Sequence, residues 1–416
     1  MVLNKVTIFL TSVFLSLFFS GVQVIGEPIK LTPYDVVFVI FGTGMLINLL
    51  YRGRLYINLT LRQAMAIFML LLIWHSVQML RASNIMRAFT LLLILIRDGL
   101  TMLLISTAIS SLPKRDTIAS LFFNISILTV IPGLLLFLVS ISTPDRIINE
   151  PYPGLIYRAG ERLIPHFQGF SHNPIYFATL SLFSITTGFF ILTQNRQRKM
   201  LSMLGLLILA MAFFAAFQRG PFVVLMMFLT IVIVNAIFLP SLRRTLKKTV
   251  RVPRVYGLVL FVLLLLAFVR LPYYEITLLQ RLMWRFQTAE WHLRFNRWSQ
   301  MLSISSESPV IGYGLRESEM LIGGQFVENS YIEIFYDQGL IGLITWVIFL
   351  GYISVVGIKK LRTDISLLPW FSGWWIVLLS MGYISMHYDP LTWILAGVIV
   401  GWRTNTSQIV KENPIN

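Results

Sequence analysis

Long apolar segments alternate with short polar ones along the whole chain. Apolar runs near the roughly 20 residues that an α-helix needs to cross a bilayer recur from one end to the other. The pattern predicts an all-α, polytopic membrane helical bundle with about twelve spans, or eleven if the short last one does not cross. The predicted spans are 6–25, 36–50, 63–80, 88–112, 117–142, 174–193, 200–217, 221–239, 255–270, 335–357, 367–386 and 391–402.

Composition agrees with a membrane protein. Of 416 residues, 56% are hydrophobic and 12% charged, whereas soluble domains carry about 25% charged residues. The chain has no cysteine, which excludes disulfides, thiolate nucleophiles and cysteine-bound metals. The net charge of +16 is explained by loop charges that fix orientation, so no nucleic-acid partner is predicted. The first span lacks a small-x-small cleavage site, and we expect an uncleaved helix.

The arginines and lysines predict the orientation. With the N-terminus in the cytoplasm, 20 of them fall in inner segments and 13 in outer ones. Positive charge is enriched on the cytoplasmic side of membrane proteins, so both termini are predicted to be cytoplasmic. The predicted division is into N-terminal spans, a first outer loop, central spans, a second outer loop, and C-terminal spans with a short tail: 1–142, 143–173, 174–270, 271–334 and 335–416.

The kind of positive charge also differs between the two sides. Eight of the nine lysines fall inside, whereas the outer segments hold twelve arginines and one lysine, Lys30. The planar arginine fork suits phosphate and carboxylate oxygens, so these arginines could bind an anionic substrate. Salt bridges to outer acids are the alternative, and the sequence leaves both open. Such acids include Glu150, Glu161, Glu275 and Glu290.

The second outer loop contains a predicted helix around 280–300. Its aromatic residues recur at helical spacing and form one stripe, which suits the membrane interface. Arg294 and Arg297 fall on the adjoining face, so the helix is expected to lie on the outer surface and to present polar groups sideways. A plain packing helix against the bundle is the alternative. The stripe consists of Trp284, Trp291, Phe295 and Trp298.

Four outer constellations carry the candidate chemistry. No P-loop, dinucleotide fingerprint or zinc spacing is present, and the five histidines have no metal-binding pattern. We therefore expect no cofactor, and phosphate handling by arginines. The constellations are Gln218-Arg219-Gly220-Pro221; Arg294 to Trp298 followed by Pro309 to Gly314; Gly169 to Pro174; and Glu328 to Glu333 running into Gly339 to Gly342.

Together these segments resemble the O-antigen ligase and polymerase superfamily, from about residue 165 to 345. The likeness rests on Gln218-Arg219-Gly220, on Arg294, Trp298 and the Pro309–Gly314 turn, on Glu328 to Tyr331 before the Gly339–Gly342 step, and more loosely on Gly169 to Asn173. Leu293 stands where the family has glycine. The resemblance implies a GT-C-like, metal-independent membrane glycosyltransferase that acts outside the membrane on undecaprenyl-diphosphate-linked glycans.

The resemblance also implies roles for single residues. Arg219 and Arg294 would clamp the diphosphate, because departure of this group builds negative charge. Glu328 would be the base that takes the proton of the acceptor hydroxyl; a structural salt bridge to either arginine is its alternative. The further substrate-binding candidates are Arg297, His172, Asn173, Asn329, Tyr331 and Arg97. Asn329 and Tyr331 either orient sugar hydroxyls or cap and pack the next helix.

Two adjacent charges interrupt a predicted span. Arg97 and Asp98 diverge by about 100° around a helix, so we expect different partners for them. Intramembrane charges are functional candidates by default. Arg97 would reach the lipid phosphate, or form a buried pair with another helix. His75 is interpreted as a contact between helices.

The residue at position 328 distinguishes the ligases of the superfamily from its polymerases. Ligases usually carry histidine at this position, and polymerases often carry an acid, so the sequence favours a polymerase of lipid-linked repeat units. A chain-length regulator is the further partner considered. Ligation of finished polymer to a lipid A-type acceptor is the close alternative. A flippase or exporter is a different class, which the outer location of the charges and the lack of a repeat disfavour. The signature strings of cell-wall glycan polymerases are not strong here.

Overall fold

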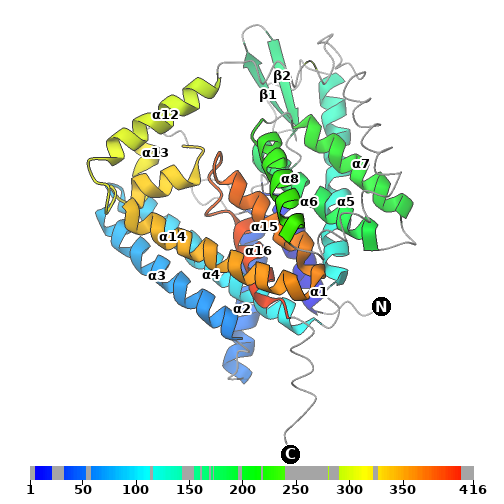
Figure 1. Cartoon of the computed structure of the whole chain (residues 1–416), viewed down its shortest axis with the longest axis horizontal. Coiled ribbons are helices and arrows are strands. Elements are labelled where there is room, and N and C mark those ends of the chain that lie inside the picture. The colour runs from blue at the N-terminus through cyan, green and yellow to red at the C-terminus, as the bar shows by residue number, and fades with distance from the viewer. Residues whose placement is uncertain are drawn as a thin grey trace, which may run out of the picture. The chain divides into compact units, whose positions relative to one another are not determined.

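The computed structural model is predominantly helical (Figure 1). By contact clustering the chain forms two compact units, residues 1–40 with 114–288 and residues 41–113 with 289–416. Helix α2 (Pro33–Arg52) contributes to both. The structure describes residues 5–20, 32–52, 58–112, 116–142, 154–159, 162–167, 170–171, 173–194, 199–216, 219–238, 280, 290–321 and 327–403.

The first unit is built around α5 (Asp116–Ser142). Phe122 of this helix lies in an aromatic cluster, with ring centroids 5.3 Å from Phe14 and 4.5 Å from Phe183. Because these rings come from three helices, their contacts fix α5 against α1 and α6. The other elements of the unit are α1 (Lys5–Phe18), β1 (Gly154–Ala159), β2 (Arg162–Phe167), α6 (Pro174–Gln194), α7 (Lys199–Ala215) and α8 (Arg219–Phe238).

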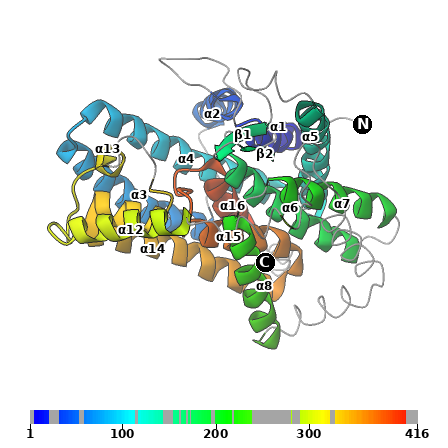
Figure 2. The ribbon, with the colours of Figure 1, turned by 90° about the horizontal axis from the view of Figure 1, so that it is seen from above.

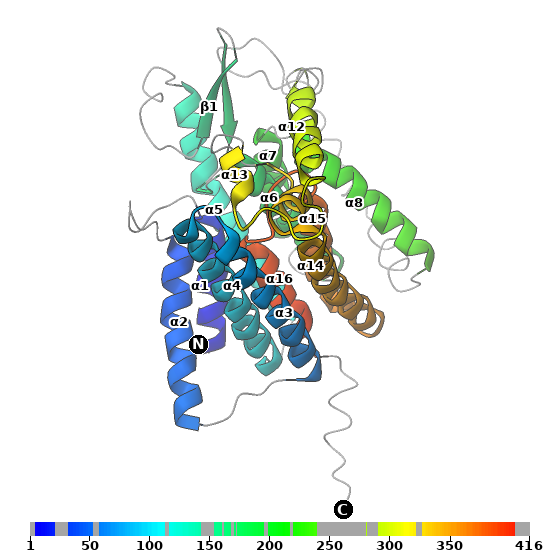
Figure 3. The same cartoon turned by 90° about the vertical axis from the view of Figure 1, so that its left-hand side faces the viewer.

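The second unit has α16 (Pro390–Gly401) at its centre. This helix is buried along its length and packs against α4 (Ile85–Ser111), where a Cβ added to Gly397 would lie 2.8 Å from the carbonyl oxygen of Met102. Figure 3 shows α3 and α4 side by side, and α12 and α13 lie at the N-terminal end of α14 (Figure 2). The remaining elements are α3 (Leu59–Arg81), α12 (Glu290–Ser305), α13 (Glu317–Leu321), α14 (Ser330–Thr363), a 3-10 turn η2 (Ile365–Leu367) and α15 (Leu368–Ser380).

The predicted spans correspond closely to the helices. Each one except 255–270, which lies outside the described residues, overlaps a helix, although the helix in 367–386 already ends at Ser380 and residues 21–25 of the first span also lie outside the described residues. Five helices of the described part are long and apolar enough to cross a membrane by length and composition: Leu59–Arg81, Ile85–Ser111, Thr117–Phe137, Pro174–Leu192 and Ser330–Thr363. The chain is therefore an integral membrane protein with a helical core.

A β-hairpin in the first outer loop was not predicted. Strands β1 and β2 pair antiparallel, with Gly154 opposite Phe167 and Ala159 opposite Arg162. Only two residues separate the strands in the sequence, and both lie outside the described residues. Two short strands give a much weaker sequence signal than the surrounding apolar spans.

Helix α14 is broken at Gly339, and a distant loop fills the break. Gly339 has φ 66°, in the left-handed region, so the normal hydrogen bonds of the helix stop there. Residues 309–314 supply the missing partners. Leu340 N donates to Pro309 O at 2.8 Å, and Gly314 N donates to Asp337 O at 2.9 Å. A helix break at membrane depth is tolerated because protein groups satisfy the exposed backbone.

Two glycines make this contact sterically feasible. A Cβ added to Gly339 would lie 2.4 Å from the carbonyl oxygen of Val310. One added to Gly312, whose φ is 68°, would lie 2.4 Å from the nitrogen of Gly339. The sequence predicted a tight turn at the first glycine motif. The structure shows that the motifs at 309–314 and 339–342 meet backbone to backbone, and we call this contact the glycine joint.

Substituting a residue of the glycine joint should lower stability. We expect Gly339→Ala to reduce the free energy of unfolding by about 2 kcal/mol or more, because it combines backbone strain with a steric clash. Gly351→Ala is the matched control, since it lies in the same helix and an added Cβ would meet nothing within 4 Å. Thermal unfolding in detergent measures both. Equal melting temperatures for the two variants would contradict the role of the joint.

Candidate functional site

The ends of α12 and α14 form a small platform. Met301, Val327 and Tyr336 are buried together, and Trp298 packs against them. The indole Nε1 of Trp298 donates to the carbonyl of Val327 at 3.0 Å. These contacts hold α12 against the residues that immediately precede α14.

The predicted catalytic residues Arg294 and Glu328 meet on this platform. Arg294 Nη2 lies 2.8 Å from Glu328 Oε2, and the side chains are 26% and 31% exposed. Arg294 lies one helical turn before Trp298, so the packing of the indole also places the guanidinium. Because water reaches these two side chains only in part, their charges can interact more strongly with a third charge than the charges of a fully exposed pair can. The structural salt bridge considered for Glu328 is therefore present.

Glu328 has an unusual backbone conformation. Its φ is 55°, a region that residues other than glycine seldom occupy. Such strain persists only where the surroundings hold it, and it clusters at functional sites. Here the surroundings are Trp298 on one side and the start of α14 on the other.

Asn329 and Tyr331 both make structural contacts. The Asn329 side-chain oxygen accepts from the nitrogens of Tyr331 and Ile332, so this residue caps α14. Its amide nitrogen donates to Gly382 O at 2.9 Å. The Tyr331 hydroxyl donates to Leu378 O at 3.0 Å. These contacts fit the capping and packing alternative, and a role in sugar binding remains a prediction.

The predicted surface helix is described in part. Its described part is α12, Glu290–Ser305, and residues 281–289 lie outside the described residues, Trp284 among them. Within the stripe, Trp298 packs into the platform, and its ring contacts that of Phe295, which is 54% exposed. The helix therefore packs against α14 through one side. Arg297 is half-buried and makes no ion pair within the described part of the chain.

Three predicted site residues belong to the other compact unit. Arg219 is the first residue of α8. The side-chain oxygen of Asn173 accepts from the nitrogen of Ile175 at 2.7 Å, so it caps the start of α6. His172 lies outside the described residues. The roles of these three residues in substrate binding remain predictions.

The expectation of separate partners for Arg97 and Asp98 is wrong. Arg97 Nε and Nη2 donate to the same oxygen, Asp98 Oδ1, at 2.9 and 2.7 Å. Neighbouring Cβ atoms diverge on a helix, but the long arginine side chain folds back to reach the carboxylate. In apolar surroundings the nearest opposite charge is strongly favoured. Asp98 is fully buried and Arg97 is 18% exposed.

Substitutions of Arg97 and Asp98 should distinguish a structural role of this pair from a catalytic one. We expect Asp98→Leu to destabilise the protein by about 3–5 kcal/mol, because it leaves a guanidinium without its carboxylate. The double variant Arg97→Leu/Asp98→Leu should recover most of the stability, since it removes both charges. Unfolding in mixed micelles measures both. A stable double variant without activity would show that Arg97 also acts on the substrate.

The sequence analysis missed two carboxylates next to the predicted base. Glu333 and Asp337 lie in the first segment of α14 and are 7% and 3% exposed. Glu333 accepts a hydrogen bond from Ser385 and lies 4.0 Å from His387 Nε2. Asp337 accepts from the nitrogens of Arg316 and Ser318. Their four-residue spacing on one helical face was the available signal.

His75 joins helices, as predicted. Its Nε2 lies 3.0 Å from the Tyr388 hydroxyl and 3.2 Å from Gln338 Nε2.

Tyr313, in the loop of the glycine joint, donates to Ile304 O at 2.8 Å. Burial, and then the nearby carboxylate of Glu307, raise the pKa of Tyr313.

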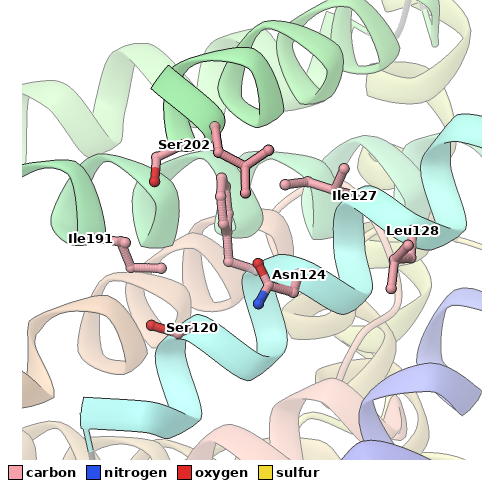
Figure 4. Close-up of a pocket in the computed structure, with 8 residues that line it drawn as sticks. Ser120, Asn124, Ile127, Leu128, Ile191 and Ser202 are labelled. Carbon is pink, nitrogen blue, oxygen red and sulfur yellow. The ribbon is translucent and has the colours of Figure 1, made fainter. Parts of the chain in front are cut away.

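A cavity of about 350 Å³ lies elsewhere, between α5, α6 and α7 (Figure 4). None of the predicted site residues lines it. Its lining is Ser120, Phe123, Asn124, Ile127, Leu128, Ile191, Leu201 and Ser202. Within the described residues no group of three or more histidine, aspartate or glutamate side chains could hold a metal ion.

Comparison with known proteins identifies a family match that spans the candidate site. Residues 182–347 match the family model described as O-antigen ligase. The match contains Arg219, Arg294 and Glu328 and lies within the region of the predicted resemblance, apart from its last two residues. A search of curated proteins finds no match. The family implies an enzyme of the O-antigen ligase or polymerase type, resembling a membrane glycosyltransferase. The match over residues 182–347 supports the resemblance of this integral membrane protein to the O-antigen ligase and polymerase superfamily.

Proposed function

We propose that this protein polymerises oligosaccharide repeat units carried on undecaprenyl diphosphate, at the periplasmic face of the inner membrane. The Arg294–Glu328 pair is the observation that carries the proposal. It brings a phosphate-binding group and a carboxylate together within the matched segment. An acid at position 328, where ligases of the superfamily usually carry histidine, favours a polymerase.

The reaction follows from these groups. A sugar hydroxyl of the acceptor glycan attacks the anomeric carbon of the donor, and the bond from that carbon to the diphosphate oxygen breaks. Glu328 accepts the hydroxyl proton, and the lipid diphosphate leaves with the bonding electrons. Arg294 stabilises the negative charge that develops on this group. Arg297, one turn from Arg294, provides a further donor for the phosphates.

Because of the ion pair, binding of the lipid-linked donor would help to activate Glu328 as the base. In the free protein Glu328 Oε2 lies 2.8 Å from Arg294 Nη2, so the guanidinium holds the carboxylate. A bound diphosphate would compete with Glu328 for Arg294 and would free the carboxylate. The base would then become effective only when a donor is present, which limits wasteful transfer to water.

Purified protein tests the function directly. Incubation with lipid-diphosphate-linked repeat units alone should give a ladder of lengthening glycans. A parallel reaction would add a lipid A-type acceptor to preformed lipid-linked polymer. Product in the second reaction alone would identify a ligase. Absence of product in both, with the protein folded, would overturn the proposal.

The proposed periplasmic location can be tested separately. The chain has no cysteine, so a single introduced thiol reports its own accessibility. Gln300 is exposed on α12, and we expect Gln300→Cys to react with a membrane-impermeant maleimide on intact spheroplasts. A cysteine at 359, in a predicted cytoplasmic segment, is the control and should react only after permeabilisation. The reverse pattern would overturn the orientation.

A further inference from the structure

Arg81 ends α3 and holds the loop of the glycine joint. Its Nη1 donates to Ile311 O at 3.0 Å, and its Nη2 donates to Gly312 O at 3.1 Å. The fork of one guanidinium thus spans two successive carbonyls. An ammonium group lacks this planar geometry. Arg81 is one of the outer arginines for which the sequence offered phosphate binding or salt bridging, and its described contacts are of neither kind.

Gln78 supports the same loop from one turn earlier in α3. Its side chain is fully buried, and its Nε2 donates to Ile311 O at 2.8 Å. The backbone carbonyl of Gln78 accepts from Leu315 N at 3.3 Å. Buried amide groups of this kind are costly to leave unpaired, so they restrict the loop to one position.

The opposite edge of the loop bonds to α14 on both sides of its break. Tyr313 N donates to Tyr336 O at 3.1 Å before the break, and Ile341 N donates to Val310 O at 3.2 Å after it. The loop therefore lies between the end of α3 and the two segments of α14. Any shift of the loop would change the angle between those segments.

A continuous series of contacts leads from the loop to Glu328. The rings of Tyr313 and Tyr336 are stacked, with centroids 4.8 Å apart. Tyr336 is buried against Val327, the residue before Glu328. Trp298, one turn from Arg294, bonds to the same Val327. The placement of the loop thus bears on the geometry of the ion pair.

We propose that Arg81, assisted by Gln78, is a positioning residue that fixes the loop and thereby aligns Glu328 with Arg294. This inference rests on the proposed function for its effect on turnover. It assigns Arg81 a role through other residues and no contact with the substrate. A misplacement of about 1 Å at a reacting group can lower a rate roughly 100-fold.

Kinetics give the first test. We expect Arg81→Gln to lower kcat about 100-fold while changing the KM for the lipid-linked donor by less than about threefold. Arg87→Ala, an exposed arginine at the start of α4, is the matched control for charge and should retain normal kinetics. A normal kcat in Arg81→Gln would overturn the proposal.

A structural measurement gives the second test and needs no activity. Val310 and Ile344 are 54% and 48% exposed, so cysteines there can carry spin labels in the cysteine-free chain. The distance distribution between them should be narrow in the parent and broad in Arg81→Gln. An unchanged distribution would overturn the proposal. If the parent makes no product from lipid-linked glycans, the proposed function fails, and these distances still decide whether Arg81 holds the loop.

Rescue distinguishes positioning from substrate contact. A short bis-maleimide between Val310→Cys and Leu340→Cys would tie the loop to α14; both native side chains are exposed. The cross-link should restore turnover in Arg81→Gln, because the loop is then held without the guanidinium. A cross-linked variant that stays inactive, while the cross-linked parent is active, would assign Arg81 to the substrate and reject the positioning role.

Discussion

Arg294→Ala is expected to abolish chain extension while the protein stays folded and inserted. The guanidinium would no longer stabilise the charge on the leaving diphosphate, and the loss of one such preorganised donor lowers a rate by about 10²–10³-fold. Both side chains of the ion pair are more than a quarter exposed. The remaining carboxylate is then partly solvated, and the stability change should be below about 1 kcal/mol.

The length of the glycan ladder made by purified protein measures this effect. Arg87→Ala, the exposed arginine control defined above, removes an outer positive charge outside the matched segment. It should leave the ladder unchanged. Normal polymer length from Arg294→Ala would remove Arg294 from the mechanism, and equal losses in both variants would point to overall charge.

Glu328→Gln is expected to stop turnover with donor binding retained. Glutamine keeps the size of the side chain but cannot accept the acceptor proton, and loss of a general base lowers kcat by about 10²–10⁴-fold. Donor affinity should be equal or higher, because Arg294 no longer shares its charge with a carboxylate. Single-turnover kinetics and a donor-binding assay separate the two quantities.

Glu307→Gln is the matched control for this substitution. Glu307 is exposed in the same unit and accepts from the Tyr313 hydroxyl at 3.2 Å, away from the ion pair. It should turn over normally. Near-native turnover in Glu328→Gln would demote Glu328 to a structural role, with the salt bridge to Arg294 as its function.

Sequence reasoning predicted the helices well because each span carries a strong local signal. Apolar runs of membrane length identified the spans that the structure describes, and the motif order predicted the superfamily. The Arg294–Glu328 pair was also anticipated, as a clamp with a base or as a salt bridge. Here the chemistry of opposite charges was enough to suggest contact.

Contacts between distant segments could not be predicted in the same way. The two glycine motifs were recognised separately, but their meeting depends on a helix break at Gly339 that periodicity does not reveal. Arg97 and Asp98 were assigned different partners because helix geometry describes Cβ directions and not the reach of a flexible arginine. Asn329 was left between two roles, and only the positions of Gly382 and Tyr331 show how it is bonded.

The contacts of Arg81 have a consequence for biosynthesis. Arg81 and Gly312 are 231 positions apart in the chain, and Gly339 follows still later. During translation α3 is completed first, and its carbonyl-binding end has no partner until the later residues emerge from the ribosome. In the proposed mechanism, completion of α14 is therefore coupled to maturation of the site, and a nascent chain truncated before Gly339 would carry Arg294 and Glu328 without the support proposed to align them.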